Sequence, residues 1–152
     1  MDFHPLVIHY PIAFLTTYAV CELLRFRKLL NLPHWFYIKA VLVTVGELGA
    51  IVTVIAAEMS TALAAENALV DKYKLFMFVT AIIFGGIALS YLYEWFRPTK
   101  WSLFAMKPVV IIPLALMGLF FVVVAGGLFG ATVYGTHFDP FLASIFKILN
   151  VY

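Results

Sequence analysis

Four long apolar stretches are the feature that most constrains how this chain can fold, and they cover about residues 5–24, 35–57, 73–96 and 109–134. Each reaches the length of about 20 residues that an α-helix needs to cross about 30 Å of hydrocarbon. The sequence does not show the alternating segments of about 10 residues from which membrane β-barrels are built. Because a backbone in lipid must satisfy its own hydrogen bonds, the stretches predict four transmembrane helices.

The composition fits lipid rather than water as the solvent of this chain. Of its 152 residues, 64% are hydrophobic and 12% are charged, whereas about half and about a quarter are usual in soluble domains. The length allows a single transmembrane domain over 1–152, in which a tail over 141–152 is too short to span and is expected at the interface. A net charge of only +2 gives no support to a nucleic-acid partner.

Basic and aromatic residues beside the stretches predict their orientation. The side that holds the first and third connections carries Arg25, Arg27, Lys28, Lys39, Arg97, Lys100 and Lys107, and the opposite side carries Lys72, Lys74 and Lys147. Since cytoplasmic connections are rich in Lys and Arg, we expect an all-α, integral membrane four-helix bundle with both termini on the non-cytoplasmic side. An interfacial aromatic belt is expected on the basic side, made of Trp35, Tyr37, Tyr91, Tyr93, Trp95 and Trp101. A pigment or quinone pocket is the alternative for these rings.

Small residues recur at helical spacing in three of the stretches and predict where helices pack together. The rows are made of Gly46, Ala50, Thr53 and Ala57, of Gly86 and Ser90, of Gly126 and Gly130, and of Gly127 and Ala131. In lipid, close approach of two backbones stabilises a helix pair, so these rows are expected to face neighbouring helices. The alternative is that glycine is simply common in membrane helices.

Two carboxylates in or beside the second stretch need an explanation, because a charge deep in a bilayer is costly. Glu47 lies near the middle of the stretch, and Glu58 follows eleven residues later. Eleven residues are about three helical turns, so both side chains project from one face and form a candidate proton pathway. The alternative is that Glu47 is protonated or hydrogen-bonded to a neighbouring helix and only fixes packing. Glu22 lies one turn from Arg25, and a local ion pair is expected there.

Three histidines fall at the outer ends of the first and fourth stretches under this topology, at His4, His9 and His137. Neutral imidazoles are ligands of haem and of metal ions. The cluster therefore predicts a b-type haem held by His9 with either His137 or His4, and the alternatives are a metal ion or simple capping of helix ends. Pro11 removes the hydrogen bond to Val7, so a break in the helix is expected there.

Two motifs are similar to a known family. Residues 4–13, HPLVIHYPIA, resemble the opening His-Pro-x-x-Val-His-Phe-Pro-Ile-Ala of a bacterial family of predicted four-helix membrane proteins, domain of unknown function family 2231. Residues 126–134, GGLFGATVY, resemble that family's closing Gly-Gly-x-Leu-Val-Tyr segment. The resemblance implies a bacterial inner-membrane protein with a redox neighbourhood, because such domains occur fused to or beside cytochrome c and Rieske modules.

The predicted function is that of a small membrane subunit of a respiratory or electron-transfer complex, with haem b as a cofactor. The alternatives are a cofactor-free accessory subunit of a larger membrane complex and a proton or ion pathway through Glu47 and Glu58. The expected partners are the lipid bilayer and either other membrane subunits or further copies of the chain. Because the sequence carries no phosphate-binding glycine loop and no nucleophile elbow, a subunit role is favoured over a free-standing enzyme.

Overall fold

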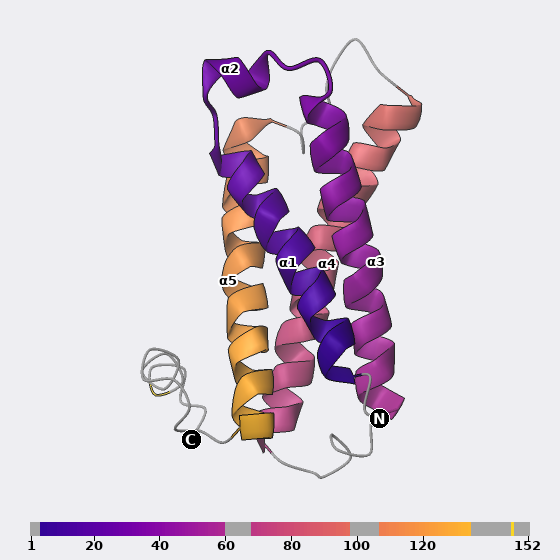
Figure 1. Cartoon of the computed structure of the whole chain (residues 1–152), viewed down its shortest axis with the longest axis vertical. Coiled ribbons are helices and arrows are strands. Elements are labelled where there is room, and N and C mark those ends of the chain that lie inside the picture. Colours follow the sequence, from indigo (N-terminus) through magenta and orange to yellow (C-terminus); the bar gives the residue numbers. More distant parts are fainter. Residues whose placement is uncertain (1–3, 60–67, 98–106, 135–146, 148–152) are drawn as a thin grey trace.

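The computed structural model describes residues 4–59, 68–97, 107–134 and 147, and within these ranges it is α-helical with no strand. Four long helices run side by side along the longest axis of the molecule (Figure 1). They are α1 (His4–Leu23), α3 (Trp35–Met59), α4 (Ala68–Phe96) and α5 (Pro108–Tyr134), and a single turn, α2 (Arg27–Leu30), lies between the first two. Three of them, α3, α4 and α5, are long and apolar enough to cross a membrane.

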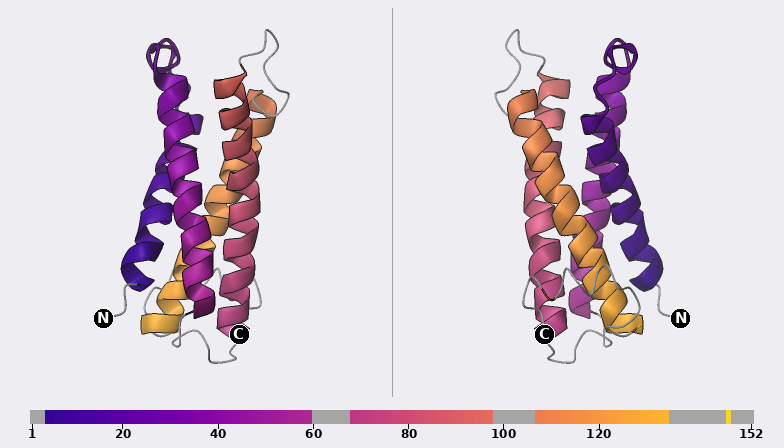
Figure 2. Two further views of the ribbon diagram at one scale, coloured as in Figure 1. Left: turned by 90° about the vertical axis from the view of Figure 1, so that its right-hand side faces the viewer. Right: turned by 90° about the vertical axis from the view of Figure 1, so that its left-hand side faces the viewer.

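Each long helix packs against two others around a common core. Helix α1 lies against α3 and α5, and α4 lies against the same two helices. Figure 2 shows α1 beside α3 and α4 beside α5 over much of their length. Two hydrophobic clusters fill the interior: one surrounds Val43, Phe84 and Tyr91, and the other surrounds Tyr73 and Leu128. The apolar interior of the long helices therefore consists of two clusters, one toward each end of the molecule.

The outward faces of the long helices are apolar as well. Large hydrophobic side chains on this surface include Leu48, Ile55, Phe78, Leu89 and Phe120, which are between 47% and 68% exposed. A helix at the surface of a water-soluble protein carries polar residues on its outer face, whereas a helix that is apolar all round belongs in lipid or in a core. The exterior of this bundle therefore suits a hydrocarbon solvent.

The observed helix bounds are close to the predicted ones except around the second connection. We expected a loop from Glu58 to Lys72, but α3 continues to Met59 and α4 begins at Ala68. The expectation was wrong because we placed each helix end at the last apolar residue, and both helices continue into polar residues. Asp71 lies in the first turn of α4, where the positive end of the helix dipole stabilises an acidic side chain outside the apolar span.

The break expected at Pro11 is also wrong, because α1 runs from His4 through Pro11 to Leu23. The proline still removes one backbone hydrogen bond. Packing compensates for this loss, since Pro11 is buried and a Cβ placed on Gly49 of α3 would lie 3.4 Å from its Cβ. Helices in membrane proteins commonly tolerate such a proline, because neighbouring helices can satisfy the backbone group that it leaves free.

Glycines lie where the helices approach most closely. A Cβ on Gly46 of α3 would lie 2.7 Å from Cδ2 of Leu15, and one on Gly126 of α5 would lie 3.2 Å from Cδ1 of Ile12, both on α1. Gly127 and Gly130, also on α5, are buried. The close helix contact expected at Gly86 is not present. Gly86 is exposed, and a Cβ there would meet nothing within 4 Å, because it borders an open space that Ile111 and Leu114 of α5 also line.

Gly118 provides a test of this packing. A Cβ on Gly118 would lie 2.7 Å from Cε2 and Cζ of the buried Phe84 ring on α4. We predict that Gly118→Ala lowers the free energy of unfolding by about 1–3 kcal/mol relative to Gly86→Ala, because an added methyl group in a filled core displaces its neighbours. Both substitutions change helix propensity equally, so their difference reports packing. Thermal unfolding in detergent measures it, and equal stability of the two variants would contradict the observed contact.

Candidate functional site

A buried ion pair joins α1 to α3 toward the end of the molecule where α2 lies (Figure 1). Nζ of Lys39 donates a hydrogen bond to Oε2 of Glu22 over 2.7 Å. The hydroxyl of Tyr91, on α4, donates to the same oxygen over 2.9 Å. The side chain of Glu22 is 3% exposed and that of Lys39 is 14% exposed. Three helices therefore meet at a single carboxylate oxygen.

Aromatic rings enclose this ion pair. Nζ of Lys39 lies 5.6 Å from the centroid of the Tyr91 ring, within the range of a cation–π contact. Tyr18 packs edge-on against Tyr91 with 5.9 Å between ring centroids, and Phe36 lies 5.3 Å from Tyr91 by the same measure. The rings pack around Tyr91, whose hydroxyl donates to Glu22.

The partner of Glu22 differs from the one predicted. We expected a pair with Arg25, but α1 ends at Leu23, so Arg25 is no longer placed by helical spacing and its side chain is exposed. Tyr91 was also expected in an interfacial belt and is instead completely buried. A signal was present in the sequence: Lys39 lies inside an apolar stretch, at a depth similar to that of Glu22 across the connection. Two opposite charges at matched depths would have indicated this pair.

A cavity of about 380 Å³ opens beside the ion pair, and residues from all five helices line it. Its polar wall is formed by Glu22, Lys39 and Tyr91, and Arg25 adds a second cation. Apolar side chains such as Leu30 of α2 complete the lining. The cavity combines positive charge with an apolar wall at one end of the bundle.

Glu47 lies in the middle of α3 and is 7% exposed. Its Oε2 atom is buried and makes no hydrogen bond with any residue that the structure describes. Its Oε1 atom faces α4, where a Cβ on Gly85 would lie 3.3 Å from it. The missing side chain at Gly85 therefore makes room for a carboxyl group inside the core.

Further polar side chains are buried on both sides of Glu47 along the core. Thr44, one turn earlier on α3, has a buried hydroxyl with no hydrogen-bond partner in the described part of the chain. Toward the other end, Thr53 and Thr80 are completely buried, and the Thr80 hydroxyl donates to the carbonyl of Phe76 over 2.8 Å. The buried hydroxyl of Tyr73, near the start of α4, likewise finds no partner among the described residues.

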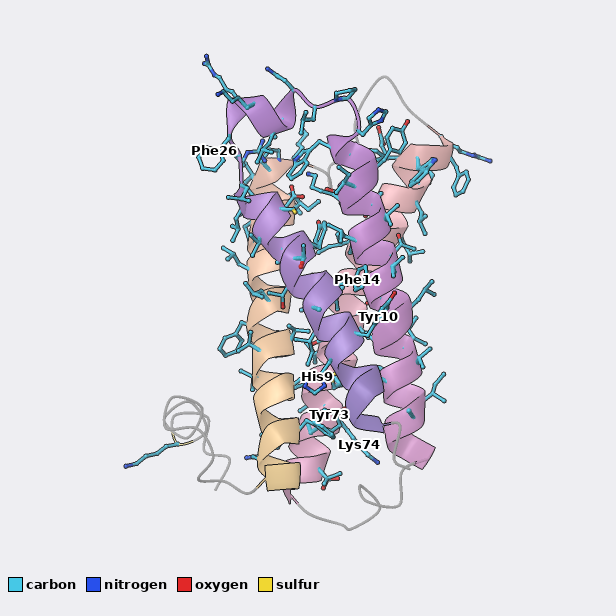
Figure 3. The ribbon with its side chains drawn as sticks, viewed as in Figure 1. His9, Tyr10, Phe14, Phe26, Tyr73 and Lys74 are labelled. Carbon is cyan, nitrogen blue, oxygen red and sulfur yellow. The ribbon has the colours of Figure 1, made fainter. Side chains whose placement is uncertain are left out.

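Only part of the predicted histidine and glutamate sites falls within the described residues. His4 begins α1, and the exposed His9 lies toward the end of the molecule opposite α2 (Figure 3). His137 and the tail over 141–152, apart from Lys147, lie outside the described residues, as does the side chain of Glu58. Within the described ranges, no three His, Cys, Asp or Glu side chains gather as a metal site.

A close contact lies about one turn after His9 on α1. Ile12 reaches α5, where a Cβ on Gly126 would lie 3.2 Å from its Cδ1. Helices α1 and α5 therefore pack together near this histidine.

These side chains define two different polar sites in one apolar core. The charges of Glu22 and Lys39 compensate each other, whereas Glu47 makes no ion pair with another described residue. The first site can hold helices together, and the second can take up and release a proton. No model of a known protein family, no curated protein and no solved structure matches this chain.

The ion pair leads to a stability prediction. Lys39→Met leaves Glu22 buried without its cation, and we expect a loss of about 3–5 kcal/mol in the free energy of unfolding. The double variant Glu22→Leu/Lys39→Met removes both charges and is expected to recover most of this loss. Arg25→Met, which changes the partner predicted from sequence, should leave stability unchanged. Unfolding in detergent measures all three, and a loss caused by Arg25→Met but not by Lys39→Met would contradict the observed pair.

Proposed function

We propose that the protein crosses the membrane four times, with both termini outside the cytoplasm of a bacterium. The 20 residues of α1 give about 30 Å of helix, which matches the hydrocarbon thickness and supports a fourth span. At the end where α2 lies, the described basic residues outside the core are Arg25, Arg27, Lys28, Arg97 and Lys107. Lys72 and Lys74 lie near the start of α4 at the other end. The excess of basic residues supports a cytoplasmic position for α2.

We propose that this membrane domain carries protons through Glu47. The observation behind the proposal is a carboxyl group in the middle of α3 that is 7% exposed and has an Oε2 atom without a hydrogen-bond partner among the described residues. A charged carboxylate in this position is costly, and binding a proton removes the charge. A glutamate that served only to fix packing would be expected to hydrogen-bond to a neighbouring helix.

Polar groups on both sides of Glu47 support a path through the core. Along α3, Thr44 lies between Glu47 and Lys39. Lys39 and its partner Glu22 line the cavity. On the other side, Thr80 and Tyr73 continue the series of buried hydroxyls. A hydroxyl both donates and accepts hydrogen bonds, so it can relay a proton between water molecules or carboxyl groups. Glu58, on the same face of α3 by its spacing, is the proposed exit group.

Glu47→Gln tests the proton path. The amide keeps the shape of the side chain but cannot take up a proton. We therefore expect proton flux to fall by a factor of about ten or more. Asp71→Asn is the matched control, because it removes a carboxylate that is exposed. A pH-sensitive dye inside proteoliposomes, under a potassium diffusion potential, measures the flux. Equal flux through the parent chain and Glu47→Gln, or no flux through the parent, would overturn the proposal.

Electron transfer is a second proposed function, and it is favoured by the position of α1, which carries His4 and His9, relative to the end of α5, which precedes His137 in the sequence. Helix α1 begins and α5 ends at the same end of the molecule (Figure 1). We propose on this basis a membrane subunit of an electron-transfer complex, with a b-type haem held by His9 and either His4 or His137. The haem would supply one-electron chemistry, and the imidazoles would bind its iron. The alternative role is that of a cofactor-free accessory subunit.

A reduced-minus-oxidised spectrum tests this second function. We expect the chain, purified after haem is added, to show the absorbance bands of a b-type haem and His9→Ala to lose most of them, because an axial ligand is missing. His34→Ala is the matched control, since this histidine is exposed at the other end of the molecule. A parent chain with no Soret absorbance after reconstitution would exclude the haem. Co-purification with other membrane subunits would then support the accessory role.

A further inference from the structure

We propose that the cavity beside the Glu22–Lys39 pair binds the phosphate head group of an anionic membrane lipid. The cavity has a volume of about 380 Å³ and lies where α2 and the residues after it meet the ends of the long helices. This site requires neither proton movement at Glu47 nor a haem at the opposite end. It adds a ligand to the protein rather than a step to either proposed function.

Arg25 gives the cavity its net positive charge. Among the described residues that line the cavity, Glu22 is the one carboxylate, and Lys39 compensates its charge over 2.7 Å. The side chain of Arg25 is exposed and makes no ion pair with any residue in the described ranges. An anion in the cavity therefore meets an uncompensated guanidinium group, whose fork of N–H donors matches phosphate oxygens.

The apolar part of the lining favours a lipid over a free anion. Leu30, Leu32 and Phe36 line the cavity together with the cations, and Trp35 adds an aromatic ring. A fully hydrated phosphate gains nothing from apolar walls, whereas the glycerol and first methylene groups of a lipid bury apolar surface against them. Basic pockets between transmembrane helices are a known way in which proteins hold phospholipid head groups.

The surroundings of the cavity also attract anions. Arg27, Lys28, Arg97 and Lys107 are exposed at the same end of the molecule. Among the described residues at this end, the carboxylates are Glu22 and Glu94, so positive charge predominates. Basic residues near a membrane surface attract anionic lipids, and this attraction concentrates the lipids beside the cavity.

The test uses the full chain purified in a neutral detergent and titrated with phosphatidylglycerol or with phosphatidylcholine of the same acyl chains. Trp35 lines the cavity, so its fluorescence reports binding, and Trp35→Phe identifies its share of the signal from three tryptophans. We expect phosphatidylglycerol to bind at least five-fold more tightly than phosphatidylcholine, roughly the contribution of one basic residue. Arg25→Gln should weaken binding of phosphatidylglycerol by about the same factor.

Matched variants separate the site from the general charge of this end. Arg97→Gln removes an exposed arginine that does not line the cavity, so it lowers only the general attraction of this end and should weaken phosphatidylglycerol binding less than Arg25→Gln does. Arg25→Lys keeps the charge and should retain part of the affinity that Arg25→Gln loses. Equal affinity for the two lipids, or equal losses in Arg25→Gln and Arg97→Gln, would overturn the proposal. Thermal unfolding shows whether each variant is folded.

Two further measurements distinguish lipid binding from binding of a soluble anion and from the proton path through Glu47. Glycerol phosphate carries the head-group phosphate without acyl chains, and its binding as tightly as the lipid would identify a soluble anion as the occupant and overturn the lipid assignment. Glu47→Gln should bind phosphatidylglycerol like the parent chain, because Glu47 does not line the cavity. A parent chain that prefers phosphatidylglycerol but carries no protons would show that the proton proposal alone fails. A chain that loses proton flux in Glu47→Gln but shows no lipid preference would show that the lipid proposal alone fails.

Discussion

A charge pair inside an apolar core is stable only where each charge is compensated, and the pair at Oε2 of Glu22 determines which faces of the helices meet. Once Glu22 points at α3, Leu15 lies seven residues earlier on the same face of α1. Once Lys39 points at α1, Gly46 lies seven residues later on the same face of α3. A Cβ on Gly46 would lie 2.7 Å from Cδ2 of Leu15, so these two residues are in close contact farther along this helix pair. The ion pair and the glycine contact thus specify one rotation for each helix.

Glu22 and Glu47 show how one core treats two carboxylates differently. Glu22 accepts hydrogen bonds from a lysine and a tyrosine, so its charge is bound into the packing of three helices. Glu47 sits opposite Gly85 with a buried oxygen that no described residue contacts by hydrogen bond. A carboxylate paired with a cation keeps its negative charge, whereas a carboxyl group without a partner can gain and lose a proton. This contrast supports a structural role for Glu22 and a functional one for Glu47.

Hydropathy predicted the helical class and the approximate position of every long helix, because the length of an apolar run is a property of the sequence alone. The partner of Glu22 was not predicted, since it depends on how two helices are rotated about their axes. Rotation also decided that Tyr91 is buried and that Gly86 is exposed, although both lie in the same apolar stretch. Short-range rules such as helical spacing carry no information on these contacts. The haem site at His9 and His137 stays a prediction.

The ion pair has a consequence for how the chain enters a bilayer. Glu22 and Lys39 belong to consecutive long helices that are separated by only eleven residues, from 24 to 34. A lysine or an acidic residue costs about 2.5–3.5 kcal/mol at the centre of an inserting segment, and Glu22 and Lys39 lie near the ends of their helices, closer to water. If α1 and α3 enter a bilayer together as a hairpin, each charge already has its counterion. The pair would then favour insertion of the two helices together over insertion of one segment at a time.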